Sequence, residues 1–413
     1  MASQDSPSFE TFPIPPCDLR LRSQISFCHP GYEEPMNTLL FLPRVDPVPP
    51  GAAVAASSTP TFGVHHRTAL VACQIIANNA FDTGYFTLDK DGLQRVNIPP
   101  DGILTGEKYY LILGDGPSQY PIVPSFLDWE FPHGRIPEPW NQVPVTASST
   151  TPDCAVTNFS LCTEQAHIVP REEETWYVRN GMGIYGANLG DINEATNVLP
   201  LRSDIHRCFD NRWFVIVPKT AGTEVSTPAA HHSPQFVTHI ISTDMAQYWP
   251  TYHNTLVQRL RADCRPYLFA RFAWAVLLHV KPLINSGIPR HIIRVQMTSS
   301  EGQAVLKRKA ELLTGAVLKK NYGGGSSKRA IPLGKSAVDD GSLVESGVSS
   351  DASMDGGFWG DMMYEWNVRG TRRRKQVSSE TDPDMMPSDN DKTVTDMNET
   401  PVEDSPLSHW AVS

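Results

Sequence analysis

The stretch Cys154–Lys219 constrains the fold of this chain more than any other, because three polar side chains in it each lie beside a short apolar run. His167 lies in QAHIVP, a β-like run that can hold an imidazole rigidly, and Asn197 precedes the extended run VLPL. Ser203 is a suitable helix N-cap, so His206 is expected in the first turns of the following helix. The pattern predicts two strands and a helix that carry these polar groups.

The second histidine has an acid one helical turn away. His206 and Asp210 are four residues apart, share a helical face and can converge on one ion. An imidazole with a carboxylate suits a transition metal, or Mg²⁺ that retains several waters. Hydrolysis of a phosphodiester needs a base for water, a cation for the phosphate charge, and a group that orients the base. The stretch therefore predicts a small metal-dependent nuclease site, although pairing with Arg207 or Arg212 is a structural alternative for Asp210.

The order strand, His, loop, Asn, strand, helix, His resembles the ββα-metal motif of the HNH endonuclease family, in the form common among fungal proteins. The nine-residue step from Asn197 to His206 is also the step of that motif. The matching positions are Cys154, Val156, Thr157, Ala166 to Pro170, Asn197, Leu199, Leu201, Ile205, His206, Phe209 and Asp210. Upstream, HRTALVACQIIANN, YYLIL and YPIVPSFLDWEFPHG are similar to the family's N-terminal module, so the resemblance covers most of residues 60–295.

The resemblance implies a role for each polar residue of the motif. His167 would be the general base, and Asn197 would orient it or help to ligate the metal. His206 would be a metal ligand, with Asp210 as a further candidate. The expected cofactor is a divalent ion (Mg, Mn, Zn or Ni), and the expected partner is nucleic acid, with DNA favoured. The protein would be a metal-dependent HNH endonuclease that hydrolyses phosphodiester bonds.

One position departs from the wider HNH superfamily. Many members carry Asp or His directly before the first motif histidine as a metal ligand, whereas this chain carries Ala166. Either Asp210 or a nearby acid such as Glu164 compensates, or His167 itself ligates, or metal binding is weak. The departure leaves a second hypothesis open, in which a catalytically degenerate HNH scaffold binds nucleic acid or protein without cutting. A third is an interaction protein that acts through its first domain and its tail.

The remaining sequence predicts an α+β protein with flexible ends. Residues 1–20 are rich in Pro and Ser and are expected to be disordered. An α+β module is expected over residues 21–145, with strands in RSQISFCHP, NTLLFLP, GYFTLD, LQRVNI and EKYYLIL and a helix in HRTALVACQIIANNAF. The HNH nuclease domain takes residues 146–295, with C-terminal helices expected in TYHNTLVQRL and in the apolar PYLFARFAWAVLLHVKPLI. Gly, Ser and clustered charge predict a disordered charged tail over 296–413.

Composition limits the class of protein. Seven cysteines without a CxxC pair argue against a disulfide scaffold and against a zinc ribbon. The N-terminus lacks the basic and apolar regions of a signal peptide, and no apolar window is long enough to span a bilayer. A soluble, intracellular protein is therefore expected.

The charge distribution leaves nucleic acid open as a partner. The net charge is −10, but residues 377–413 hold nine acids and one lysine, so the acidity belongs mostly to the tail. The basic clusters 307–309 and 372–375 indicate nuclear-import signals, phosphate-contacting arms, or simply solvated charge. The first interpretation makes the nucleus the candidate compartment.

Overall fold

The computed structural model describes residues 18–49, 61–114, 116–143, 153–187, 190–220, 233–258, 260–300 and 303–323. Strands and helices are mixed along these residues, which confirms the predicted α+β class. All described residues belong to one compact unit. Disorder was predicted for residues 1–20, of which residues 1–17 lie outside the described residues, as do residues 324–413 of the predicted tail. The prediction is wrong for residues 19 and 20, which belong to the 3-10 helix η1, Leu19–Leu21.

The first part of the chain forms a mixed four-stranded sheet in the order β2-β1-β7-β5. Its strands are β1 (Gln24–Cys28), β2 (Thr38–Pro43), β5 (Gly84–Thr87) and β7 (Lys108–Leu113). Strand β1 pairs antiparallel with β2 and parallel with β7. Its alternate residues Ile25 and Phe27 are fully buried, and the Phe27 ring lies against Phe86 and Tyr109. This burial stabilises the sheet by about 25 cal/mol per Å² of apolar surface.

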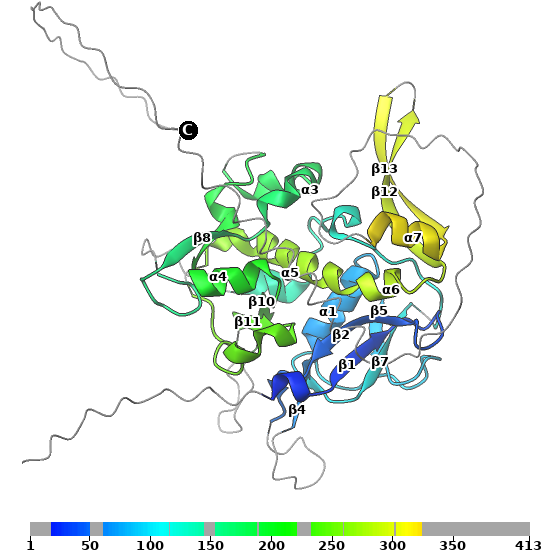
Figure 1. The fold of residues 1–413 in the computed structure, drawn as a ribbon, viewed down its shortest axis with the longest axis horizontal. Helices are drawn as coiled ribbons and strands as arrows, with labels where there is room; N and C mark the ends of the chain where they lie inside the picture. Colours follow the sequence, from blue (N-terminus) through cyan, green and yellow to red (C-terminus); the bar gives the residue numbers. More distant parts are fainter. Residues whose placement is uncertain are drawn as a thin grey trace, which may run out of the picture. The chain divides into compact units, whose positions relative to one another are not determined.

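Helix α1 (His66–Ile76) packs on this sheet (Figure 1). His65 is the N-cap of this helix, and its Nδ1 accepts a hydrogen bond from the Thr68 backbone N–H. A second, small sheet leads into the helix, and its strands are β3 (Asp46–Pro47), β4 (Phe62–His65) and β6 (Ile103–Leu104). The strands and the helix predicted for this module are thus present, with one exception.

The exception is the run LQRVNI, which was expected to form a strand. It makes only an isolated bridge, between Thr87 and Arg95. Pro99 and Pro100 follow at once, and proline has no N–H to donate to a ladder, so the pairing cannot extend.

The stretch singled out by its sequence forms a two-stranded antiparallel sheet followed by a helix. These elements are β8 (Thr163–His167), β9 (Val198–Arg202) and α4 (Ser203–Asp210). Short helices connect the two strands: η3 (Arg171–Glu173), α3 (Glu174–Arg179), η4 (Met182–Tyr185) and η5 (Ala195–Asn197). A further antiparallel pair, β10 (Phe214–Lys219) and β11 (Gln235–Ile240), continues from α4.

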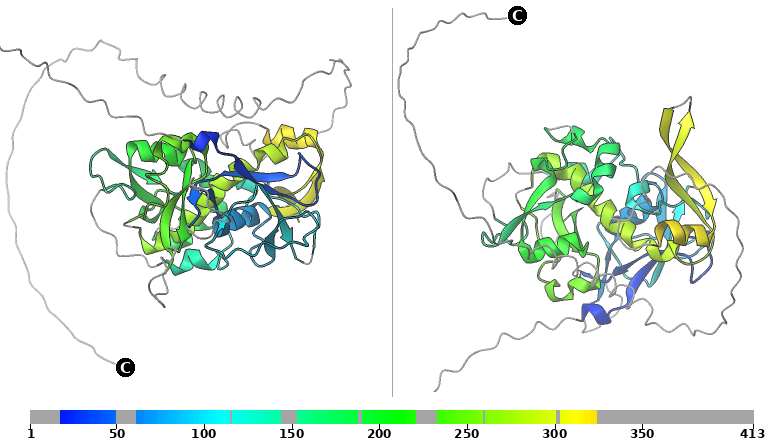
Figure 2. Two further views of the ribbon diagram at one scale, coloured as in Figure 1. Left: turned by 90° about the horizontal axis from the view of Figure 1, so that it is seen from below. Right: turned by 45° about the horizontal axis from the view of Figure 1, so that its top comes forward.

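Helix α5 (Arg265–His279) joins the two halves of this unit, because it packs on α1 and on β10 (Figures 1 and 2). It is buried nearly all round, as its sequence predicted. Pro266 lies in its first turn, where the missing N–H is not needed. The remaining short helices are η2 (Phe126–Asp128), α2 (Glu138–Gln142), η6 (Thr243–Tyr248), η7 (Ala262–Cys264) and α6 (Lys281–Ile284). No helix in the described part of the chain has the length and apolarity needed to cross a membrane.

Two predictions for the C-terminal half are corrected. The run TYHNTLVQRL, residues 251–260, is not a helix in its described residues, because its backbone bonds to β11. The Thr255 carbonyl accepts from the Thr238 N–H, the Asn254 N–H donates to the Thr238 carbonyl, and Leu256 bridges Val237. A neighbouring strand edge has therefore outweighed the helical propensity of the segment.

The second correction concerns residues 296–300 and 303–323, which were predicted to be disordered and instead form regular structure. Strands β12 (Arg290–Ser300) and β13 (Gln303–Leu313) pair antiparallel over their whole length, and helix α7 (Gly315–Tyr322) follows. The two strands form a ribbon that extends past the neighbouring elements (Figure 1, and the right view of Figure 2). Ile292 and Leu318 are buried, and Arg308 binds Glu130. Cross-strand pairing and these anchors stabilise the segment, in which Ile293, Val295 and Met297 alternate with polar residues as in a strand.

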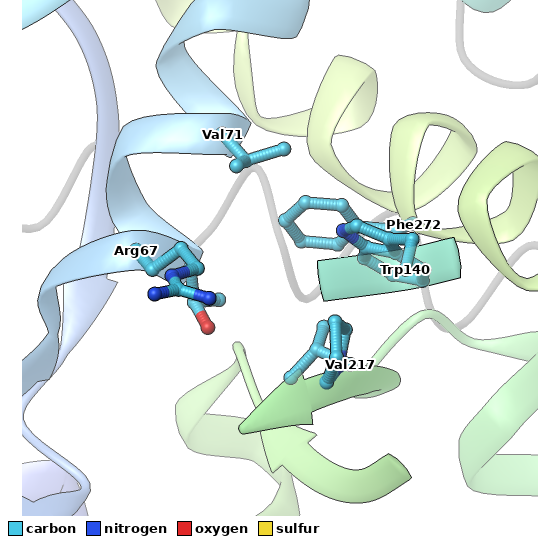
Figure 3. A pocket seen from close by; sticks show the side chains of 7 residues that line it. Arg67, Val71, Trp140, Val217 and Phe272 are labelled. Atoms are coloured by element: carbon cyan, nitrogen blue, oxygen red, sulfur yellow. The ribbon is translucent and has the colours of Figure 1, made fainter. Parts of the chain in front are cut away.

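A small pocket marks the contact between α1, α2, α5 and β10 (Figure 3). Val71, Trp140, Val217 and Phe272 form its apolar wall, with Arg67 at its edge. Its volume of about 10 Å³ is close to the least that one water requires. This junction therefore has room for about one water.

Candidate functional site

The register of β8 and β9 brings the predicted site residues to one end of the small sheet. His167, the last residue of β8, pairs with Val198, the first residue of β9, and Asn197 comes directly before it. Helix α4 follows β9 without a loop, so His206 lies close to the same strands. The cap of α4 is Arg202, not Ser203 as predicted, and no side chain caps it. Strand β9 continues to residue 202, and the helix begins at Ser203, one residue earlier than an N-cap at Ser203 would place it.

His206 lies between two carboxylates. Its Nδ1 is 2.7 Å from Glu164 Oε2, and its Nε2 is 3.5 Å from Asp210 Oδ2. The His206 side chain is 20% exposed, whereas Glu164 and Asp210 are 54% and 53% exposed. The group is thus held by the protein on one side and open to solvent on the other.

This arrangement fits a divalent ion. Two ligand atoms about 2.1 Å from one ion, at a tetrahedral angle, lie about 3.4 Å apart, close to the separation of His206 Nε2 and Asp210 Oδ2. Histidine ligands usually donate their other ring N–H to a carboxylate, which fixes the tautomer. Glu164 accepts from Nδ1 and so leaves the Nε2 lone pair directed towards Asp210.

The position of Glu164 also bears on the absence of an acid or a histidine at residue 166. The two residues are two apart on β8 and therefore share a face of the strand, which α4 covers. Ala166 is fully buried under the helix, while Glu164 extends past it to His206. Residue 166 is thus buried and without an acid, and the carboxylate beside His206 is supplied two residues earlier, by Glu164.

His167 lies half-buried beside this group. Its Nε2 is 3.2 Å from Asn193 Oδ1 and 3.2 Å from Arg171 Nε. The amide group of Asn193 is oriented by its own bond to Asp191, so its oxygen faces the ring. An amide oxygen only accepts, so in that contact Nε2 carries the proton and Nδ1 the lone pair; the contact with Arg171 belongs to the other tautomer.

The electrostatic surroundings keep the His167 ring neutral. Burial and then the charge of Arg171 lower the pKa of His167, and only smaller contributions from Asn193 and Asp210 raise it. A neutral imidazole at neutral pH can take a proton from water. Sequence reasoning did not single out Arg171 or Asn193; the Asp-x-Asn turn at 191–193 is the one local signal for the latter.

Asn197 is completely buried, and its side chain bonds to the backbone. Its Oδ1 accepts from the Val169 N–H at 2.8 Å, and its Nδ2 donates to the carbonyls of Val169 and Ile192 at 3.0 and 2.8 Å. These bonds connect the segment after His167 to the loop that carries Asn193. In this structure Asn197 thus acts on His167 through the backbone rather than by touching its ring.

Residues 154–217 match the HNH endonuclease family. This stretch is an HNH endonuclease domain. The match covers β8, β9, α4 and most of β10, and so includes all four predicted site residues. No curated protein and no solved structure matches the chain. Membership in this family implies nucleic-acid binding, and HNH domains generally use a divalent metal ion.

Glu164, His167, His206 and Asp210 are called the HNH centre from here on. A second cluster, outside this centre, has the residue types of a metal site. Within the described part of the chain, Asp46, His239 and His253 bring their ligand atoms within 4.8 Å of one another. Asp46 Oδ1 accepts from Lys219 Nζ at 2.6 Å and from His253 Nε2 at 2.9 Å, and all of these side chains are buried. Burial raises the pKa of Asp46, but Lys219 and His253 more than offset it and hold the pKa well below its usual value.

The hydrogen bonds of this cluster argue against a metal there. His253 Nδ1 accepts the backbone N–H of Ile240 at 3.2 Å. A neutral ring then carries its proton on Nε2, which donates to Asp46 and has no lone pair for an ion. The ammonium of Lys219 already supplies the positive charge that Asp46 requires. The HNH domain therefore offers the better metal site, and the buried cluster joins β3 to β10 and β11.

Proposed function

We propose that the HNH domain is a metal-dependent endonuclease that hydrolyses phosphodiester bonds in nucleic acid, with DNA as the expected substrate. The observation that carries the proposal is the line Glu164–His206–Asp210, open to solvent, with His167 beside it. A base, an ion-binding pair of ligands and an orienting carboxylate are the parts that such a hydrolysis needs.

The residues divide the chemistry between them. His167, oriented by Asn193 through Nε2, takes the proton of the attacking water at Nδ1. A divalent ion held by His206 and Asp210 would supply positive charge for the phosphate and the leaving oxygen. Arg171 is exposed beside His167, and its guanidinium suits a phosphate oxygen. Asn197 keeps the two segments of the centre in register through the backbone.

The alternative is an HNH scaffold that binds nucleic acid or a protein without cutting. One observation favours this alternative: the carboxylates of Glu164 and Asp210 already have an imidazole or a cation as a neighbour. Glu164 is engaged with His206, and Asp210 Oδ1 lies 4.0 Å from Arg271. If these contacts are stronger than ion binding, the centre holds no metal.

Cleavage assays separate the two functions. Purified protein is incubated with supercoiled plasmid or with RNA in Mg²⁺, Mn²⁺, Zn²⁺ or Ni²⁺, beside the variants His167→Ala and His206→Ala. Loss of the base is expected to slow cleavage by about 10²–10⁴-fold. The matched control is His133→Ala, an exposed histidine that contacts Tyr185 instead of the HNH centre. Equal cleavage by all four proteins would exclude the endonuclease.

We also propose that the protein acts in the nucleus, where its substrate would be chromosomal DNA. The motivation is the basic cluster 372–375, which lies outside the described residues. Replacing its four basic residues by Gln in a fluorescent fusion is expected to abolish nuclear accumulation. Unchanged accumulation would contradict this role for the cluster.

A further inference from the structure

Arg271 is a buried arginine that binds both segments of the HNH centre. It lies in the middle of α5, outside the residues that match the HNH family, and its side chain is 1% exposed. Its Nη1 donates to the carbonyl of Ile168 at 3.2 Å, and its Nη2 donates to the carbonyl of Phe209. Ile168 directly follows His167, and Phe209 directly precedes Asp210. One guanidinium therefore sets the distance between the strand of the base and the helix of the ligands.

The same guanidinium also faces the carboxylate of Asp210. Arg271 Nη2 is 4.0 Å from Asp210 Oδ1, while the other oxygen, Oδ2, is 3.5 Å from His206 Nε2. The two carboxylate oxygens thus have different neighbours: Oδ1 lies towards the buried cation, and Oδ2 lies towards the imidazole. Such a contact favours one rotation of the carboxylate.

A buried cation at this place is costly for stability. Arg271 lies over the ring faces of Phe209 at 3.7 Å and Trp274 at 4.5 Å, and its Nε has no hydrogen-bond partner among the described residues. Burial lowers its pKa to about 9, so the group is still charged at neutral pH. A well-packed apolar side chain of similar volume is often no less stable than a buried ion pair. The cation is therefore better explained by what it holds in place.

We propose that Arg271 is a positioning residue of the HNH centre, which holds His167 and Asp210 in register and leaves one Asp210 oxygen free for a metal ion. The inference rests on the proposed function, because it concerns the same centre. It extends the functional unit beyond residues 154–217 to α5.

Arg212 provides a matched control. It is also a buried arginine, and its guanidinium lies 3.5 Å from the ring centroid of Trp274, a ring that Arg271 also faces. Its Nη2 lies 4.0 Å from Glu172 Oε1, and its backbone N–H, which a Lys substitution retains, donates to the carbonyl of Phe209. Substitution of either arginine disturbs the same buried region, and the guanidinium of Arg271 is the one that donates to the carbonyls of Ile168 and Phe209.

The test is calorimetric titration of the full chain with Mn²⁺ or Ni²⁺, with thermal unfolding measured in parallel. Arg271→Lys and Arg271→Met are expected to weaken metal binding about 10–100-fold, the usual effect of losing a group that orients a ligand. Arg212→Lys is expected to lower stability while leaving metal affinity unchanged. If a folded Arg271→Lys binds metal as the wild type does, or if Arg212→Lys weakens binding equally, the proposal is overturned.

A second readout needs no metal. In ¹⁵N-histidine spectra of the metal-free protein, the ring signals of His167 and His206 are expected to move in Arg271→Lys and to stay in place in Arg212→Lys. Unchanged His167 and His206 signals in Arg271→Lys would overturn the proposal whether or not the protein binds metal. Failure of the wild type to bind metal or to cut nucleic acid would instead count against the endonuclease.

Discussion

The protein contains two clusters of histidine and carboxylate that differ in exposure and in hydrogen bonding. Asp46, His239 and His253 are buried, and Asp46 is surrounded by donors that include a lysine. His206 instead lies between two half-exposed acids, with one ring nitrogen bound to Glu164 and the other facing Asp210. The first cluster has three ligand-type residues close together, and the second has a histidine whose lone pair is available.

The difference shows that proximity of ligand types does not by itself define a metal site. In the buried cluster, the Ile240 N–H decides which nitrogen of His253 carries the proton, and that nitrogen is the one near Asp46. In the HNH centre, the Glu164 carboxylate decides the tautomer of His206 in the opposite sense. We therefore expect the buried cluster to control stability and the HNH centre to control metal binding.

The largest effect is expected for Asp46→Ala. Among the described residues, the substitution leaves the buried ammonium of Lys219 with the Asn254 amide oxygen as its acceptor, and breaking a buried pair costs about 3–5 kcal/mol of unfolding free energy. Because the pKa of Asp46 is held below its usual value, its contribution is present at neutral pH and is lost as the pH falls through the folded-state pKa. Urea denaturation of the wild type and of Asp46→Ala at several pH values measures the loss of unfolding free energy and its dependence on pH.

A double variant checks the cause of this loss. Asp46→Ala with Lys219→Met removes both charges and is expected to recover much of the stability. Metal titration of Asp46→Ala tests the comparison itself. If that variant loses metal binding while His206→Ala retains it, the two clusters have been assigned the wrong way round.

The next effect concerns the orienting acid of the HNH centre. Glu164→Ala removes the carboxylate that binds His206 Nδ1 and is expected to weaken metal affinity about 10–100-fold. Glu164→Gln keeps an oxygen acceptor and is expected to lose less. Equal affinity of Glu164→Ala and the wild type would show that this acid does not orient the ligand.

A smaller effect is expected at His239 of the buried cluster. Its Nδ1 is buried, 3.8 Å from Asp46 Oδ2, and has no hydrogen-bond partner among the described residues. His239→Phe is of similar shape and is expected to change the unfolding free energy by less than about 1.5 kcal/mol, without change in metal affinity. A loss as large as that of Asp46→Ala would mean that the ring carries charge or holds an ion.

The smallest effect is a shift in pH dependence. His167 acts as a base only when neutral, so cleavage is expected to fall as the pH drops through its pKa. Burial and then Arg171 lower this pKa, so Arg171→Gln is expected to move the acid limb of the rate profile to higher pH. Arg171→Lys retains the charge and should leave the limb in place. A limb that is unchanged in Arg171→Gln would argue against His167 as the base.

Local sequence predicted the elements of the HNH domain well, but not the contacts that complete its centre. Strands β8 and β9 and helix α4 were expected because apolar residues frame the polar ones. Asn193 and Arg271 could not be predicted, since one depends on the path of a loop and the other lies on a helix far along the chain. The ribbon β12–β13 was missed because the Gly, Ser and clustered charge of the following residues outweighed the alternation of Ile293, Val295 and Met297 in the prediction.

The amino-acid sequence determined the α+β class, the order of the HNH elements and the placement of His206 and Asp210 on one helical face, because these follow from periodicity and short spacing. Tertiary structure alone decided which histidine nitrogens are free, since that depends on the partner of the opposite nitrogen: Glu164 for His206 and Ile240 for His253. It also placed Arg271 beneath the centre. Hydrogen bonds between residues distant in the chain are not encoded in any local pattern, and they distinguish the two clusters.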